Sequence, residues 1–421
     1  MSTASSSTAQ FGVVSRWSPA AATLAVLSFI AALCFPFVRV APNRLMSGQP
    51  VDVVQLLQGP QSAWAMALAG LLVVWLLTSA APASRIVLWL RVVVLAVSMP
   101  GWLALAASHA AQVAGDLSPF ARTSLGAAFW LLWALTALAL ADTLQRLQAG
   151  RPTRVATVLL VLGAIAWLLL SRRCDELSLL KEYANRSEVF AQAISRHGQI
   201  VGLALAFTLV LGLPLGWAAH RDARVGPALL PVLNIVQTIP SIALFGLLMA
   251  PLAWLAAHST VLTAAGISGV GLAPGVIALT LYSLLPVVRG TLAGLAQVPA
   301  SVTQSAVGLG MDAREIFWRV EVPLALPVVL AGVRTAAIQA VGLAAVTALI
   351  GAGGLGAIMF EGLFSNAQDL VLLGVLPIVA MGMAVDAGFS LLAEAAARVA
   401  DPARRSSSTP PLSPATSRAT A

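Results

Sequence analysis

Long runs of hydrophobic residues recur along the chain, and short polar segments separate them. Ten of these runs hold about 17 to 28 residues each, enough for a helix to cross about 30 Å of hydrocarbon. In lipid, a helix also satisfies its own backbone hydrogen-bonding groups. The pattern therefore predicts an all-α polytopic membrane protein with about ten transmembrane helices, at residues 20–40, 63–80, 86–107, 123–141, 155–171, 200–219, 227–254, 272–288, 327–350 and 370–397.

Prolines interrupt the hydrophobic runs of the second half. The span at residues 227–254 is long and contains Pro231 and Pro240, so we interpret it as a helix that can be broken. Broken helices are tolerated in membranes where protein or a water-filled path receives the freed backbone groups. We therefore expect a solute path in this half. The first span has a basic flank at Arg16, yet its apolar run is longer than that of a signal peptide, so we expect a retained anchor.

Composition agrees with the pattern. Charged residues make up 10% of the chain and hydrophobic residues 59%, with a mean hydropathy of +0.91, whereas soluble domains hold about 25% charged residues. The net charge of +8 needs no nucleic acid to explain it. A cytoplasmic N-terminus places most inter-span arginines on the cytoplasmic side, as the positive-inside rule requires, although a basic cluster at residues 172–196 lies opposite. We expect a multi-pass protein of the bacterial inner membrane with both termini cytoplasmic.

Polar segments divide the chain into regions. The expected regions are a cytoplasmic tail at 1–18, a five-span membrane extension at 19–171, a periplasmic amphipathic segment at 172–198, a five-span core at 199–397 and a disordered cytoplasmic tail at 398–421. Apolar residues recur at helical spacing within residues 175–197. We interpret that stretch as a helix lying in the membrane interface, and a docking platform is the alternative.

The chain lacks the sequence features of an ATP-hydrolysing or metal-dependent enzyme. No Gly-rich turn precedes its one lysine, Lys181, so a phosphate-binding loop of the Walker type is excluded. The histidines lack metal-ligand spacing and lie near span ends, where we expect solvated or interfacial rings. They are His109, His197, His220 and His258. Cys34 and Cys174 are expected to be inert thiols within the membrane. We therefore expect a transport subunit with no metal site and no cofactor in this chain.

Polar side chains recur on one face of the span at residues 227–254. They stand at positions i, i+3, i+4 and i+7, and are Asn234, Gln237, Thr238 and Ser241. A polar stripe in lipid must face other helices or water, so these residues are candidates for the translocation path. Hydrogen bonding between helices is the alternative. Weaker candidates on later spans are Tyr282, Ser283, Thr335 and Gln339.

One acid and several glycines stand out within the later spans. Asp386 is the only acid well inside a span of this half, so we expect it to be paired or at the cytoplasmic edge rather than in a proton relay. Glycines four residues apart suit close helix packing. These pairs are Gly212 and Gly216, Gly271 and Gly275, and Gly290 and Gly294. The GAGGLG sequence at residues 351–356 has no following lysine, and we expect it to allow bending or tight packing.

Charged residues concentrate in the segment 290–326. Pro299 can open a short helix that a Gly-Leu-Gly sequence ends. Asp312 and Glu315 then have the spacing of a capping box for a second helix, which we expect Pro323 to stop. Two short helices that meet at a glycine elbow and expose both apolar and charged groups would form a docking site for another protein.

This segment resembles the signature loop of binding-protein-dependent ABC importer permeases: EAA, three residues, Gly, nine residues, then I-x-L-P. Here Gln304-Ser305-Ala306, Gly310 and Val320-Glu321-Val322-Pro323 hold those places, with Gln304 in place of the family's Glu. The resemblance implies an ATPase-coupling loop formed by Gln304, Ser305, Ala306, Gly308, Gly310, Asp312, Arg314, Glu315, Phe317, Arg319 and Pro323.

The surrounding sequence resembles the osmoprotectant branch of the same family. The resemblance covers about residues 195–400 and includes LLPVLNIVQTIPSIALFGLL and LIGAGGLG, while the five-span extension resembles Yeh-type osmoprotectant permeases. It implies a type I ABC importer (MetI-like) permease core at residues 199–397, with its cytoplasmic coupling loop at 290–326.

The implied function is the permease subunit of an ATP-driven importer for glycine betaine or a related compatible solute. The implied partners are an ABC ATP-binding subunit, a periplasmic solute-binding protein, a second permease subunit that is identical or homologous, and membrane lipids. Two alternatives stay open. The same architecture can import another small solute such as an amino acid, or the chain can act alone as an ion-coupled secondary carrier.

Overall fold

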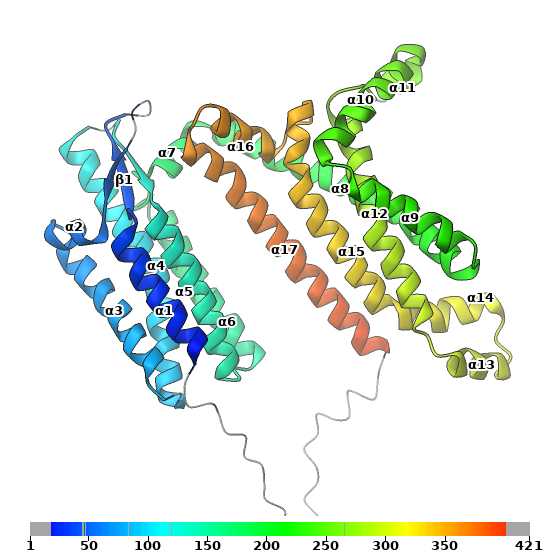
Figure 1. The fold of residues 1–421 in the computed structure, drawn as a ribbon, viewed down its shortest axis with the longest axis horizontal. Coiled ribbons are helices and arrows are strands. Elements are labelled where there is room, and N and C mark those ends of the chain that lie inside the picture. Colours follow the sequence, from blue (N-terminus) through cyan, green and yellow to red (C-terminus); the bar gives the residue numbers. More distant parts are fainter. Residues whose placement is uncertain are drawn as a thin grey trace, which may run out of the picture. The chain divides into compact units, whose positions relative to one another are not determined.

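The computed structural model describes residues 18–43, 46, 48–82, 84–118, 120–264 and 266–400, with side chains to residue 396. The chain forms two compact units, Met1–Asn185 and Arg186–Ala421 (Figure 1). The expected tails at residues 1–18 and 398–421 lie almost entirely outside the described residues.

Unit 1 is a bundle of long helices that carries a small β-sheet. Its helices are α1 (Pro19–Cys34), α2 (Val53–Gln58), α3 (Ser62–Ala80), α4 (Arg85–Asp116), α5 (Ala127–Arg146), α6 (Arg151–Leu170) and α7 (Ser178–Asn185). The antiparallel sheet has β1 (Val38–Ala41) between β2 (Gln49–Val51) and β3 (Arg122–Leu125). Buried aromatic rings join the sheet to the bundle, because the Phe37 ring centroid lies 5.7 Å from Trp102 and 5.9 Å from Phe129.

Unit 2 is built around α12 and α15. Its elements are α8 (Ser187–Arg221), α9 (Val225–Thr238), α10 (Ser241–His258), α11 (Thr260–Ala264), α12 (Leu272–Ala296), α13 (Ala300–Gly308), α14 (Ala313–Ile316), the π-helix η1 (Phe317–Glu321), α15 (Val322–Ala344), the 3-10 helix η2 (Val346–Ile350), α16 (Leu355–Phe364) and α17 (Gln368–Ala400). The most extensive helix pairings join α12 to α8, α12 to α15, and α15 to α17. Within this unit, α10 and α11 project from the other helices (Figure 1).

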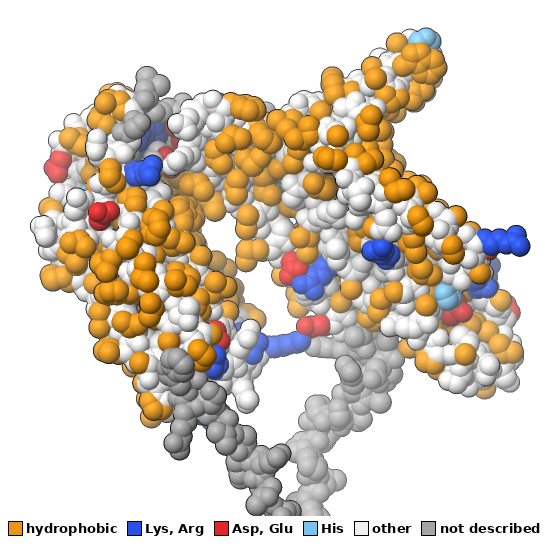
Figure 2. All heavy atoms as spheres, viewed as in Figure 1, with side chains coloured by type: hydrophobic (Ala, Val, Ile, Leu, Met, Phe, Trp, Pro, Cys, Tyr) orange, Lys and Arg blue, Asp and Glu red, His pale blue; other side chains and the backbone are white. Residues whose placement is uncertain are grey.

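Nine helices of the described residues are long and apolar enough to cross a membrane. Together with α1, which has only 16 residues, they correspond one to one with the ten predicted spans. Hydrophobic side chains are spread over the visible surface of both units and charged side chains are few, as suits contact with lipid (Figure 2).

Several local predictions were wrong, among them the start of the fourth span at Thr123, which lies in β3. The first predicted span ran to Val40, but its end forms β1. The single helix predicted for residues 175–197 is divided at Arg186, because α7 ends at Asn185 and α8 then continues into the membrane. His197 is fully buried rather than solvated, and its Nε2 lies 3.1 Å from the Val341 carbonyl oxygen on α15.

Five of the six paired glycines mark close contacts, as predicted, whereas Gly271 precedes α12 with φ +91° and a Cβ there would meet only Gly351 O at 3.9 Å. A Cβ at Gly216 on α8 would lie 2.5 Å from Thr291 Cβ on α12. A Cβ at Gly290 on α12 would lie 2.9 Å from Gly332 Cα on α15. Helix backbones at these crossings approach too closely for any larger residue, so α8, α12 and α15 form a tightly packed frame. The GAGGLG sequence bends the chain, since Gly351, Gly353 and Gly354 all have φ near +80°.

Candidate functional site

The predicted coupling segment lies between α12 and α15, at the end of unit 2 where α17 ends (Figure 1). As predicted, Pro299 precedes a short helix, α13, and Gly310 adopts φ +82°, a backbone conformation that disfavours any side chain. The predicted capping box is also confirmed. The Glu315 N–H donates to Asp312 Oδ1 at 2.7 Å, and the Asp312 N–H donates to Glu315 Oε2 at 3.3 Å. Local hydrogen bonds therefore define the elbow between α13 and α14.

Pro323 does not stop the second helix, contrary to the prediction. The helix passes from α14 through η1 into α15, and Pro323 occupies the first turn of α15. A proline inside an α-helix clashes with the carbonyl four residues earlier, which here belongs to Arg319. That carbonyl lies in the π-helical segment, where the Val322 N–H bonds to Phe317 O, five residues back. The wider π turn thus accommodates the proline without ending the helix.

The segment is attached to unit 2 through a few buried groups. Ala306 and Ile316 are buried, and the Met311 N–H donates to the Ala306 carbonyl at 3.2 Å. The Phe317 ring packs edge-on against Trp217 near the end of α8, with ring centroids 6.2 Å apart. Contacts on both sides of the elbow therefore give it a defined position.

The remaining predicted coupling residues lie on the exposed side of the segment. Exposed or partly exposed side chains belong to Gln304, Ser305, Asp312, Arg314, Glu315 and Arg319. The Ser305 hydroxyl donates to the Ser301 carbonyl, and Arg319 pairs with Glu315 at 3.2 Å. Large apolar side chains are also exposed here, above all Leu309, of which 82% is accessible. Exposed apolar and charged side chains of this kind are typical of a protein-binding site.

The predicted break of the seventh span is confirmed, and it divides the polar stripe. α9 ends at Thr238, while Ser241 begins α10, so Ser241 does not share a helical face with Asn234. Tyr282 on α12 stabilises the break between α9 and α10. Its hydroxyl donates to the Ile239 carbonyl oxygen, which the interruption of the helix leaves without a helical partner.

The other stripe residues connect α9 to α12. Gln237 Nε2 donates to the Tyr282 carbonyl at 2.8 Å, and Arg289 Nη2 donates to Asn234 Oδ1 at 2.8 Å. These contacts correspond to the alternative interpretation, in which polar groups join helices. Thr238 and Thr335 donate to carbonyls of their own helices, Gln339 is partly buried on α15, and the buried Ser283 Oγ has no hydrogen-bond partner within the described residues.

An ion pair that no sequence pattern indicates joins α15 to α17. Arg334 Nε donates to Asp386 Oδ1 at 2.7 Å. The side chains are 40% and 42% exposed, so water or another molecule has access to the pair. Asp386 was expected to be paired, which is confirmed. Its partner lies 52 positions earlier, and no local spacing indicates it. Over the described part of the chain, no group of three His, Cys, Asp or Glu residues is placed to hold a metal ion.

Comparisons with known proteins divide the chain in the same order as its two units. Residues 16–180 match the N-terminal domain of the ABC transporter permease YehY. Residues 208–405 match the inner membrane component of binding-protein-dependent transport systems. The resemblance of the extension and of the core is therefore confirmed.

Curated relatives match the second half. The osmoprotectant import permease protein OsmW of Salmonella typhimurium is 37% identical over 195 residues, which cover 45% of this chain and 84% of that protein. The glycine betaine/carnitine/choline transport system permease protein OpuCB of Bacillus subtilis is 33% identical over 190 residues, 45% of this chain and 80% of that protein. An ergothioneine transport permease/binding protein of Helicobacter pylori is 39% identical over 186 residues, 44% of this chain and 29% of that protein.

Among solved structures, an inward-facing MetNI methionine ABC transporter is similar to this chain with a TM-score of 0.44 and 20% identity, covering 50% of this chain and 98% of the other. Sequence relationship, not this likeness, assigns the family. The match of residues 208–405 and the 37% identity over most of the Salmonella permease show that the chain belongs to the family of inner membrane components of binding-protein-dependent ABC transport systems.

Proposed function

We propose that the chain is the permease subunit of an ATP-driven importer for glycine betaine or a related compatible solute. It works in the inner membrane, with both termini cytoplasmic, alongside a separate ATP-binding subunit, a solute-binding protein and a second permease subunit. The observation that carries this proposal is the exposed α13–α14 elbow, in which a capping box and a left-handed glycine position an apolar surface outside the membrane helices.

The elbow supports a mechanical role because it is joined to a packed frame. Only residues 297–299 separate α13 from α12, and α14 continues through η1 into α15. An ATPase that grips the exposed side of the elbow and closes on ATP binding would tilt α12 and α15 together. Tilting them would convert an inward-open path to an outward-open path. Gln304 stands on the exposed surface of α13, where its amide can hydrogen-bond to the ATPase in place of the family's carboxylate.

The solute class follows from the relatives, whose names specify osmoprotectants, glycine betaine, carnitine and choline. Another small solute, such as an amino acid, is the second candidate within the same architecture. The ion-coupled carrier is less well supported. The acid that such a carrier would use, Asp386, already accepts a hydrogen bond from Arg334 Nε at 2.7 Å.

Affinity purification from native membranes tests the proposal. The wild-type chain should copurify an ATP-binding subunit, and Gly310→Trp should lose it, since an indole at φ +82° distorts the elbow. Gly342→Ala is the matched control, because Gly342 lies on α15 outside the elbow and a Cβ there meets no atom within 4 Å. It should copurify the ATPase as the wild type does.

Uptake into proteoliposomes then separates the solutes. With the ATPase and binding protein supplied, glycine betaine, choline and carnitine should be imported only when ATP is present, and methionine or histidine should not. Absence of any ATPase from the wild-type preparation, together with gradient-driven uptake by the chain alone, would establish the carrier alternative instead.

A further inference from the structure

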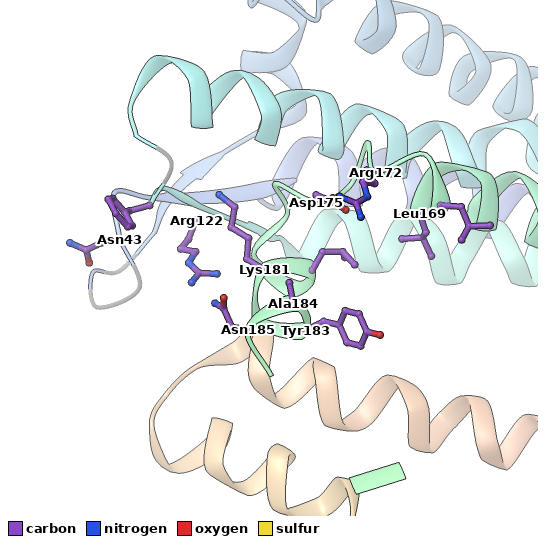
Figure 3. Close-up of a pocket in the computed structure, with 12 residues that line it drawn as sticks. Asn43, Arg122, Leu169, Arg172, Asp175, Lys181, Tyr183, Ala184 and Asn185 are labelled. Atoms are coloured by element: carbon purple, nitrogen blue, oxygen red, sulfur yellow. The ribbon is translucent and has the colours of Figure 1, made fainter. Parts of the chain in front are cut away.

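Unit 1 contains a large cavity that the transport proposal leaves without a role. Its volume is about 1240 Å³, above the roughly 300–1000 Å³ of ordinary small-molecule sites. The cavity lies where the membrane span α6 ends, and the turn after α6, the start of β3 and helix α7 surround it (Figure 3). It is therefore a concave site at the level where a membrane span meets water.

Charges of both signs line this cavity. Arg122 on β3, Arg172 in the turn after α6 and Lys181 on α7 supply three positive charges, and Asp175 supplies a negative one. Two further carboxylates lie against the cations. Glu176 pairs with Lys181 at 2.6 Å, and Glu182 approaches Arg122 with 3.7 Å between Oε1 and Nη1. The three cations and the three carboxylates around the cavity are equal in number, so the site suits a ligand that carries both signs.

One donor in the cavity wall lacks an acceptor. The Arg122 side chain is only 15% exposed, and its Nη1 has no hydrogen-bond partner within the described residues, since 3.7 Å to Glu182 exceeds hydrogen-bonding distance. A buried donor without an acceptor costs about 1–3 kcal/mol. Lys181, in contrast, has acceptors in the protein, because its Nζ pairs with Glu176 and also donates to the Ala121 carbonyl at 3.1 Å. Nη1 itself is buried, and other atoms of Arg122 line the cavity. The guanidinium fork of Arg122 suits a carboxylate or phosphate.

The cavity also has groups that can hold a positively charged part of a ligand. Asp175 is exposed to the cavity and can attract a cationic group. Tyr183 adds an aromatic face to the same lining, which suits an ammonium group. Apolar contacts come from Leu170 at the end of α6 and from Phe120, which are 84% and 77% exposed.

We propose that this cavity binds a zwitterion, with its oxyanion on Arg122 and its cationic group near Asp175. A phospholipid headgroup with a phosphate and an amine has this chemistry, and so does a free solute with a carboxylate and an ammonium. The proposal does not depend on the transport function, because binding is measured on this chain by itself.

The test uses the full chain in nanodiscs of phosphatidylglycerol doped with phosphatidylethanolamine, with retained lipid counted by native mass spectrometry. A parallel arm titrates free glycine betaine onto the same nanodiscs without phosphatidylethanolamine. The variants are Arg122→Gln, which removes the fork, and Asp175→Asn, which is exposed and keeps the fold intact. Arg173→Gln is the matched control, since Arg173 stacks on Trp167 at 4.8 Å and does not line the cavity.

We expect the binding of one probe to fall about tenfold in both cavity variants, because each variant loses about one hydrogen bond to a charged group. Binding should be unchanged in the control. Loss of phosphatidylethanolamine retention identifies the lipid as the ligand, and loss of glycine betaine binding identifies a free solute. Equal binding of both probes by all four proteins would overturn the proposal. Loss in Arg122→Gln with wild-type binding in Asp175→Asn would also overturn it, since the site would then accept an oxyanion alone.

Discussion

Replacing Gly332 with alanine tests the crossing of α12 and α15, the two helices that flank the proposed coupling segment. A Cβ at Gly332 would lie 2.6 Å from the Pro286 carbonyl oxygen and 3.0 Å from Gly290 Cα. Ordinary contact begins at 3.4 Å, so the helices must move apart by about 0.8 Å (3.4 − 2.6). Overpacking of this kind costs about 1–3 kcal/mol. In a soluble domain about as long as unit 2, each kcal/mol of lost stability lowers Tm by about 2–4 °C, so we expect Gly332→Ala to lower Tm by about 2–12 °C.

Thermal unfolding of the purified full chain in detergent, followed by tryptophan fluorescence, measures this change. Gly342→Ala on the same helix is the matched control, because a Cβ there meets no atom within 4 Å. Alanine exceeds glycine in helix propensity by up to about 1 kcal/mol, so the control should melt at the wild-type temperature or above it. If Gly332→Ala melts with the wild type, or if both variants lose stability equally, the close crossing does not exist.

Three further predictions address other contacts. Burial raises the pKa of the Cys174 thiol to about 11, and the nearby Asp175 charge adds to the effect. Maleimide should therefore label Cys174 far more slowly than the exposed Cys34 at pH 7.5. Labelling of Cys174 should increase as the pH rises toward 11. Tyr282→Phe removes the hydrogen bond to the carbonyl at the end of α9 and should cost about 1–3 kcal/mol, seen as a lower Tm, and an unchanged Tm would contradict that bond. Asp386→Asn and Arg334→Gln should each lower Tm, and the double variant that exchanges the two residues, Arg334→Asp with Asp386→Arg, should recover part of that loss. If the double variant instead loses as much Tm as the sum of the single losses, the ion pair is refuted.

Local sequence signals predicted most of unit 2. The lengths of the hydrophobic runs located its helices because lipid leaves few other structures open to such runs. The elbow was predictable because its determinants lie within a few residues of one another: Pro299 before α13, Gly310 in the turn, and the capping box of Asp312 and Glu315. The extent of the second helix was not, since the π turn that accommodates Pro323 has no sequence pattern of its own.

Features that depend on contacts between distant residues could not be predicted from the sequence. The strand β1 follows α1 without a polar interruption, so its valines extended the hydrophobic run and concealed the strand. Its partner β3 begins at Arg122, more than 80 residues later. The cavity of unit 1 is likewise assembled from separate segments near Asn43, Phe120 and Leu170, and no spacing joins them.

The continuity of α14, η1 and α15 has a mechanical consequence. Together they form one helical rod from Ala313 to Ala344, 32 residues and about 48 Å long at 1.5 Å per residue. A rod of that length works as a lever, and a tilt of about 10° about one end displaces the other end by about 8 Å. A hinge where Pro323 stands would absorb such a tilt within the segment. Without a hinge, a small rotation imposed on the exposed end becomes a displacement larger than a helix radius at the far side of the membrane.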